Sequence, residues 1–102
     1  MDRRLQLQTE LEEVLGSRHV YYQPTETKKL EYPCIVYQLS DIDLIHGDDL
    51  LYRATHGYQI TLIERSPETP LVDAILGHFR MIRFDRRFVN QNLYHNVFEL
   101  YY

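Results

Sequence analysis

The sequence predicts an α+β domain, with an antiparallel sheet and about two amphipathic helices packed on one face of it. Three observations support this class. Two segments repeat their apolar residues with the period of a helix, and five segments have the alternation or composition of strands. Short polar connections join most of these strands, which favours antiparallel pairing. The predicted order is α, β, β, β, α, β, β, which is typical of α+β domains.

The size and composition of the chain favour a single domain that covers residues 1–102, with 44% hydrophobic and 25% charged residues. The net charge of −4 disfavours specific nucleic-acid binding through a positive surface. The single cysteine, Cys34, excludes an internal disulfide, and its apolar surroundings predict a buried, inert thiol. No apolar run approaches the roughly 18 residues of a membrane span, so we expect no signal peptide and no membrane partner.

The first helix is expected at residues 4–16, where one apolar stripe is formed by Leu7, Leu11, Val14 and Leu15. A short strand follows at residues 19–24. The second helix begins at Pro70, with Thr69 as its N-cap, and runs to about residue 80. The last two strands, at 81–89 and 93–102, form a hairpin through a turn at 90–92. Alternation in the first of them predicts one face for Ile82, Phe84 and Phe88.

The two strands at residues 32–45 and 52–64 are long for so small a domain. They flank a predicted turn at 46–49, and strands of ten or more residues span roughly 33 Å. We therefore expect the ends of this pair to project from the core as a β-hairpin arm. Gly57, within the second strand, predicts a bulge or a close backbone approach. A projecting hairpin has unpaired edges unless another chain covers them.

Residues with catalytic or metal-binding chemistry are present without the spacing that such chemistry needs. The four glycines are isolated, and the five histidines lack metal-ligand spacing. Asp41 and Asp43 form a carboxylate pair, which acts in acid–base catalysis only inside a cleft. We therefore expect no enzyme, no cofactor and no metal. A small hydrolase that uses Asp41, Asp43 and His56 is the weakest alternative, because it needs a concave site that holds these groups within hydrogen-bond reach, and their strand-opposed spacing disfavours this.

Charge is distributed unevenly along the chain. Residues 41–49, the acidic segment, contain four aspartates and no Lys or Arg, whereas residues 80–87, the arginine segment, contain four arginines and one aspartate. The two segments either meet head to tail between copies, closing a ring where the rotation permits, or neutralise each other within one sheet. Both readings stay open. The predicted interface residues are Asp41, Asp43, Asp48, Asp49, Leu50, Leu51, Arg83, Arg86, Arg87 and Tyr101.

Several short motifs occur in a distinctive order: Tyr21-Tyr22-Gln23-Pro24, Tyr32-Pro33-Cys34-Ile35-Val36-Tyr37, Asp41 to Asp43, Phe84-Asp85-Arg86 and Phe98 to Tyr102. In this order and spacing, from about residue 19 to residue 102, the chain resembles the tail terminator or tail completion proteins of long-tailed phages and prophages of Gram-positive bacteria. The resemblance implies an α+β structural protein of the virion, without enzymatic activity. Six copies would form a ring that caps the tail tube, ends its polymerisation and provides the surface for head attachment.

The resemblance also implies the partners and the location. These are further copies of the chain, the tail tube protein and a head connector or neck protein, in the tail–neck region of a virion assembled in the bacterial host cytoplasm. Two alternatives remain, a head-closure or neck connector protein and a non-phage monomeric module that binds proteins. If the last strand lies inside the sheet, we expect Phe98, Leu100 and Tyr102 to anchor the core. Glu99 and Tyr101 would then be free to contact another subunit.

Overall fold

The computed structural model describes residues 3–23, 30–47 and 50–102. It confirms the α+β class and the predicted order of elements. Each strand or helix lies within about two residues of its expected position. The elements are α1 (Arg3–Leu15), β1 (Val20–Tyr22), β2 (Cys34–Gly47), β3 (Leu50–Glu64), α2 (Pro70–His78), β4 (Ile82–Asn90) and β5 (Leu93–Tyr101).

The five strands form one sheet in the order β1-β2-β3-β5-β4. The expectation of an antiparallel sheet is correct for three of the four pairs and wrong for β1, which runs parallel to β2. An antiparallel neighbour needs only a tight turn, whereas a parallel neighbour needs a longer connection. Residues 23–33 supply that length between β1 and β2, so the sheet is mixed.

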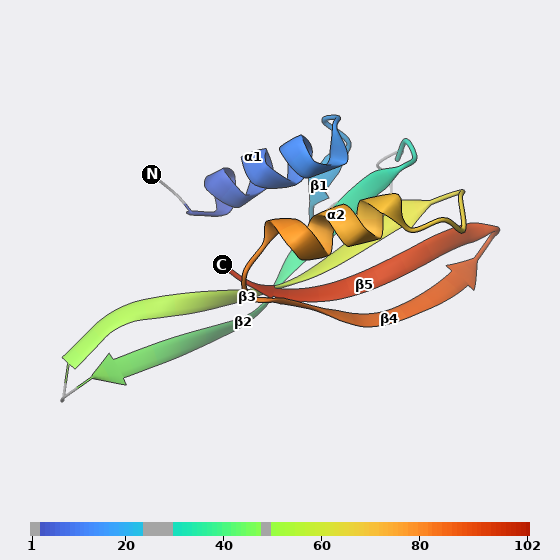
Figure 1. Cartoon of the computed structure of the whole chain (residues 1–102). Helices are drawn as coiled ribbons and strands as arrows, with labels where there is room; N and C mark the ends of the chain where they lie inside the picture. The colour runs from blue at the N-terminus through green and yellow to red at the C-terminus, as the bar shows by residue number, and fades with distance from the viewer. Residues whose placement is uncertain (1–2, 24–29, 48–49) are drawn as a thin grey trace.

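Both helices cover the same face of the sheet (Figure 1). The predicted stripe of α1 is confirmed, since Leu7 and Leu11 are fully buried in the core. The sheet contributes Tyr37, whose ring is fully buried and whose hydroxyl donates a hydrogen bond to Oε1 of Gln8 in α1, 2.6 Å away. Other buried core residues include Ile35, Ile60, Leu62, Val72, Ile75, Phe98 and Leu100.

Local backbone geometry explains where the helices begin and end. Gly16 has φ +82°, and its N–H donates to the Glu12 carbonyl over 2.9 Å, which ends α1 as predicted. Pro70 opens α2, where its missing N–H costs little. Thr69 occupies the N-cap position as predicted, and its side chain makes no capping hydrogen bond to the backbone. Its hydroxyl lies instead 3.5 Å from Oδ2 of Asp73.

A β-bulge in β4 changes the predicted faces of that strand. The register shifts between Phe84 and Arg86, so Phe84 is paired with Phe98, on the helix-covered face, whereas Phe88 is paired with His95 on the open face. The grouping of Phe84 with Phe88 was therefore wrong. The extra residue reverses the alternation beyond it. The Phe88 ring stacks on the His95 ring with centroids 4.7 Å apart.

Candidate subunit interface

The most prominent feature of the molecule is a two-stranded arm, formed by residues 41–47 and 50–56. The β2–β3 ladder continues to Gly47↔Leu50, whereas β5 pairs with β3 only from Gly57 onward. Figure 1 shows the arm leaving the sheet, and the molecule measures 50 × 27 × 22 Å along its principal axes. The predicted arm is therefore confirmed.

A second register shift lies at the base of the arm. It occurs between Leu39 and Asp41 of β2, opposite Tyr58 and Gly57 of β3. The bulge that Gly57 suggested is thus present, but the extra residue is on the partner strand. A bulge bends a strand and increases its twist, which accounts for a change of direction where the arm leaves the sheet.

The arm carries four of the predicted interface residues. Asp41 is paired with Gly57 and Asp43 with Thr55, on β2, while the start of β3 holds Leu50 and Leu51. The other two acidic positions, Asp48 and Asp49, lie outside the described residues. The predicted turn at 46–49 is wrong for its first two positions, because β2 runs to Gly47 and its last two residues are paired with Leu51 and Leu50.

The three predicted arginines lie on β4, the edge strand farthest from β2 in the sheet order. Arg83 forms an ion pair with Glu99, and Arg86 forms one with the adjacent Asp85, each at 2.6 Å. The hydrogen bond to Glu99 raises the pKa of Arg83. The arginine segment is therefore partly neutralised by residues of β4 and β5, and β4 does not pair with the strand that contributes Asp41 and Asp43 to the arm.

Arg87 lies on the helix-covered side of β4, away from Arg83 and Arg86. Its Nη2 donates a hydrogen bond of 2.7 Å to the Pro67 carbonyl, and its guanidinium lies over the Tyr94 ring, 4.8 Å from the centroid. A cation over an aromatic face is held in place by the ring quadrupole. Arg87 thus connects β4 to the segment before α2, so its contacts in this structure stabilise the chain itself.

The last residues of the sequence lie at the base of the arm. The N–H of Tyr102 donates to the carbonyl of His56 over 3.0 Å, its hydroxyl donates to Glu10 of α1, and its ring packs on Phe79. The expected anchoring of the core by Phe98, Leu100 and Tyr102 agrees with this packing. Tyr101 is half-buried and is paired with Gly57. The expectation that Glu99 is free was wrong, because it accepts two hydrogen bonds from Arg83.

Sequence reasoning missed two buried polar side chains, Glu64 and Asn96. They are 6% and 1% exposed, and Glu64 Oε2 and Asn96 Oδ1 have no hydrogen-bond partner. Burial raises the pKa of Glu64, and the charge of Arg87 opposes that rise. Alternation in the sequence could have revealed their burial, because Glu64 and Asn96 each lie two residues from a buried core residue of the same strand, Leu62 and Phe98 respectively.

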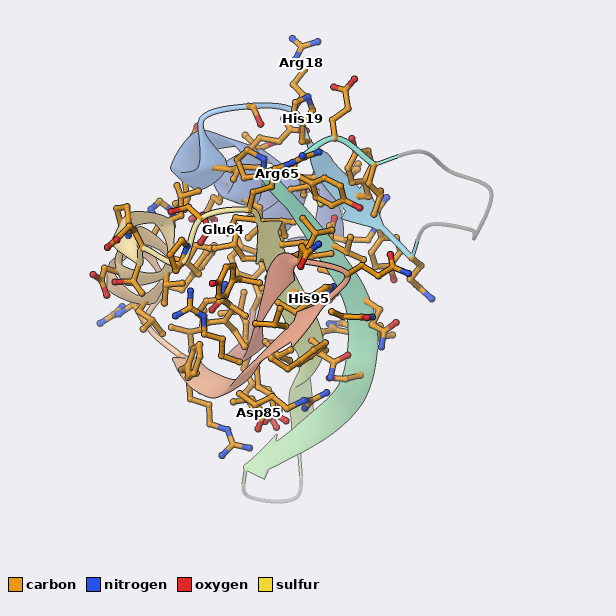
Figure 2. The ribbon with its side chains drawn as sticks, turned by 90° about the vertical axis from the view of Figure 1, so that its right-hand side faces the viewer. Arg18, His19, Glu64, Arg65, Asp85 and His95 are labelled. Carbon is orange, nitrogen blue, oxygen red and sulfur yellow. The ribbon has the colours of Figure 1, made fainter. Side chains whose placement is uncertain are left out.

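The end of the sheet opposite the arm has a shallow hollow of about 210 Å³. It is lined by Tyr32, Pro33, Glu64, Arg65 and Ser66. Figure 2 shows Glu64 and Arg65 at this end of β3, and the Arg65 guanidinium lies 5.7 Å from the Tyr32 ring centroid. The hollow is too small for most cofactors, whose pockets measure roughly 300–1,000 Å³.

Groups that a catalyst would use do not converge in the described part of the chain. His56 is paired with Ile42, between the two aspartates of the proposed hydrolase site, so alternation places it on the opposite face from Asp41 and Asp43. Among the described residues, no three His, Cys, Asp or Glu side chains lie close enough to hold a metal ion. Cys34 is fully buried, as predicted, and burial raises its pKa to about 11.

Comparisons with known proteins add no identification. No family model matches the chain, and no curated protein matches it. Within the residues that the structure describes, neither helix is both long and apolar enough to cross a membrane.

Proposed function

We propose that this chain is a structural protein of a phage tail, in which identical copies form a ring that caps the tail tube. The ring ends polymerisation of the tube and provides the surface for head attachment. By resemblance to tail terminators the ring contains six copies, and its partners are the tail tube protein and a head connector or neck protein. The protein acts without catalysis, in the tail–neck region of the virion.

The arm is the observation that supports this proposal most strongly. Its two strands continue beyond Gly57, the last residue of β3 that pairs with β5, so within the described residues each arm strand pairs only with the other. Monomeric proteins generally shorten, cover or protect a strand edge, since an unpaired edge recruits other chains. A small domain whose two longest strands extend beyond its core is well suited to assembly with other chains.

An assembly assay tests the proposal. The cognate tail tube protein is polymerised with and without this chain, and tube lengths and tube ends are measured by negative-stain electron microscopy. We expect uncontrolled lengths in its absence, and shorter tubes with a cap at one end in its presence. Unchanged lengths and bare ends at a stoichiometric excess would refute the proposal. A cap on a head connector instead of a tube would identify a neck protein.

A shortened arm provides the matched variant. Residues 44–54 are replaced by Asn-Gly, which closes a tight hairpin between the paired Asp43 and Thr55. Every core residue that the structure describes stays in place, so we expect a folded protein that fails to cap tubes. The control is Arg18→Glu, which changes an exposed residue that Figure 2 shows at the far end of the molecule from the arm. A shortened-arm protein that still caps tubes would show that the arm is dispensable.

A further inference from the structure

We propose that copies of this chain join by strand addition, with edge strand β4 of one copy pairing with the outer edge of β2 in the arm of the next. The inference rests on the self-association included in the proposed function. It goes further by naming the two surfaces and the way in which they join. It does not depend on what the assembled ring caps.

Strand β4 is an unusually open edge. All of its residues except Ile82 are exposed. Six large hydrophobic side chains are exposed among residues whose exposure is described, and four of them lie in or beside β4: Met81, Phe84, Phe88 and Val89. The strand contains no Pro or Lys, two residues that often protect edges. Its nine residues therefore present both apolar side chains and a free backbone.

The ladder shows which backbone groups of β4 point away from the sheet. The Tyr101 N–H donates to the Met81 carbonyl, which makes Met81 and Tyr101 a hydrogen-bonded pair. Hydrogen-bonded and non-hydrogen-bonded pairs alternate along an antiparallel ladder, so Ile82 and Phe84 belong to non-hydrogen-bonded pairs and direct their N–H and C=O groups outward. At the other end, Gln91 and Asn92 have positive φ, and such a two-residue turn is closed by a hydrogen-bonded pair, here Asn90↔Leu93. Alternation then directs the groups of Val89 and Arg87 outward as well.

A complementary edge exists on β2. Strand β1 pairs with it only at residues 35–37, and no other described strand lies on that side. Within the described residues, no strand therefore pairs with the outer edge of β2 from Gln38 to Gly47, a stretch of the same length as β4 to within one residue. At about 3.3 Å per residue, each edge extends for roughly 30 Å. The two edges are thus long enough to pair along their whole length.

Charge selects this pairing over the other open edges. The chain has 15 acidic and 11 basic residues, and the acidic segment holds four of the acids without a base, so the remainder of the chain is neutral. Strand β4 has three arginines and one aspartate, which disfavours contact between two β4 strands. The β3 side of the arm carries Arg53, which favours β2 as the partner. A contact between two different edges leaves one free edge of each kind at the ends of a row of copies, and such a row closes into a ring where the rotation between copies permits.

The first test removes an outward N–H without altering charge. Val89→Pro deletes a group that the ladder with β5 does not use, and proline is tolerated at such edge positions. Val89→Ala is the matched control. We expect sedimentation equilibrium to show self-association of the native chain and the control, and a dissociation constant raised about tenfold or more by the proline. A native chain that remains monomeric at about millimolar concentration, or association unaffected by the proline, would overturn the inference.

The second test exchanges charges between the two edges. The double variant Asp41→Lys, Asp43→Lys reverses the sign of charge on the arm. The double variant Arg80→Glu, Arg86→Glu reverses the sign of charge in β4 and just before it, and Arg18→Glu is the control. Each double variant alone should associate about tenfold or more weakly, whereas an equimolar mixture of the two should associate again, because each arm then meets a β4 of opposite charge. Failure of the mixture to associate would refute the head-to-tail pairing. Association without capping of tubes would count against the proposed function alone.

Discussion

Tyr102 offers the sharpest test of how the end of the chain supports the fold. Replacement by alanine removes a half-buried ring that contacts Phe79 and a hydroxyl that donates to Glu10. Two parts of the structure lose a contact at once, α1 and the start of the segment after α2, whereas the backbone hydrogen bond from Tyr102 to the His56 carbonyl remains. Tyr102→Phe is the milder change, since it removes only the hydroxyl.

The expected cost follows from these contacts. Burying a side chain of this size fully is worth about 3 kcal/mol, so half-burial accounts for about 1.5 kcal/mol. The aromatic pair with Phe79 adds about 0.5–1 kcal/mol, and the hydrogen bond to Glu10 adds about 1 kcal/mol. We therefore expect Tyr102→Ala to lower the free energy of unfolding by about 3 kcal/mol, and Tyr102→Phe by about 1 kcal/mol.

Urea unfolding followed by far-ultraviolet circular dichroism measures these differences. With an m-value of about 1.5 kcal/mol/M for a chain of this size, the midpoint for Tyr102→Ala should fall by about 2 M. The control is Tyr101→Ala, one residue earlier on the face without helices, for which we expect a smaller shift. Equal shifts for the two alanine variants would refute the reasoning, because only Tyr102 is packed against the helices in this structure.

Three further predictions concern buried groups. Cys34 should react with a thiol reagent far more slowly in the native chain than in urea, because burial raises its pKa to about 11; equal rates would contradict its burial. Glu64→Gln should be more stable than the native chain at about pH 7 and lose this advantage toward about pH 4, because the raised pKa of Glu64 in the folded state makes the stability of the native chain fall as pH rises. A difference in stability between the two chains that does not change with pH, measured by urea titration, would exclude this. Tyr37→Phe should lower the free energy of unfolding by about 1 kcal/mol, through the lost bond to Gln8, and an unchanged thermal midpoint would contradict it.

The arginines of β4 illustrate a question that the sequence raised and the structure narrowed, namely which acidic residues they contact. The sequence left open whether the acidic and arginine segments meet between copies or neutralise each other in one sheet. The structure places β3 and β5 between β2 and β4, and it pairs Arg83 with Glu99 and Arg86 with Asp85. Part of the positive charge is thus balanced locally, and the exposed edge of β4 becomes the surface to test.

The sequence by itself determined the order of elements, the buried stripe of α1 and the projecting hairpin. These properties depend on the period of apolar residues and on strand length, which are local along the chain. The fully buried Leu7 and Leu11 follow from helical spacing, and the arm follows from two strands too long for the core they border.

Only the tertiary structure decided the parallel pairing of β1, the reversed position of Phe88, the ion pair of Glu99 and the burial of Glu64 and Asn96. Each depends on which strand lies beside which, and in what register. A single extra residue at the bulge of β4 exchanges the two faces for every position beyond it, and alternation in the sequence carries no record of that shift. Register is set by contacts between residues far apart in the chain, so it emerges only when the sheet is assembled.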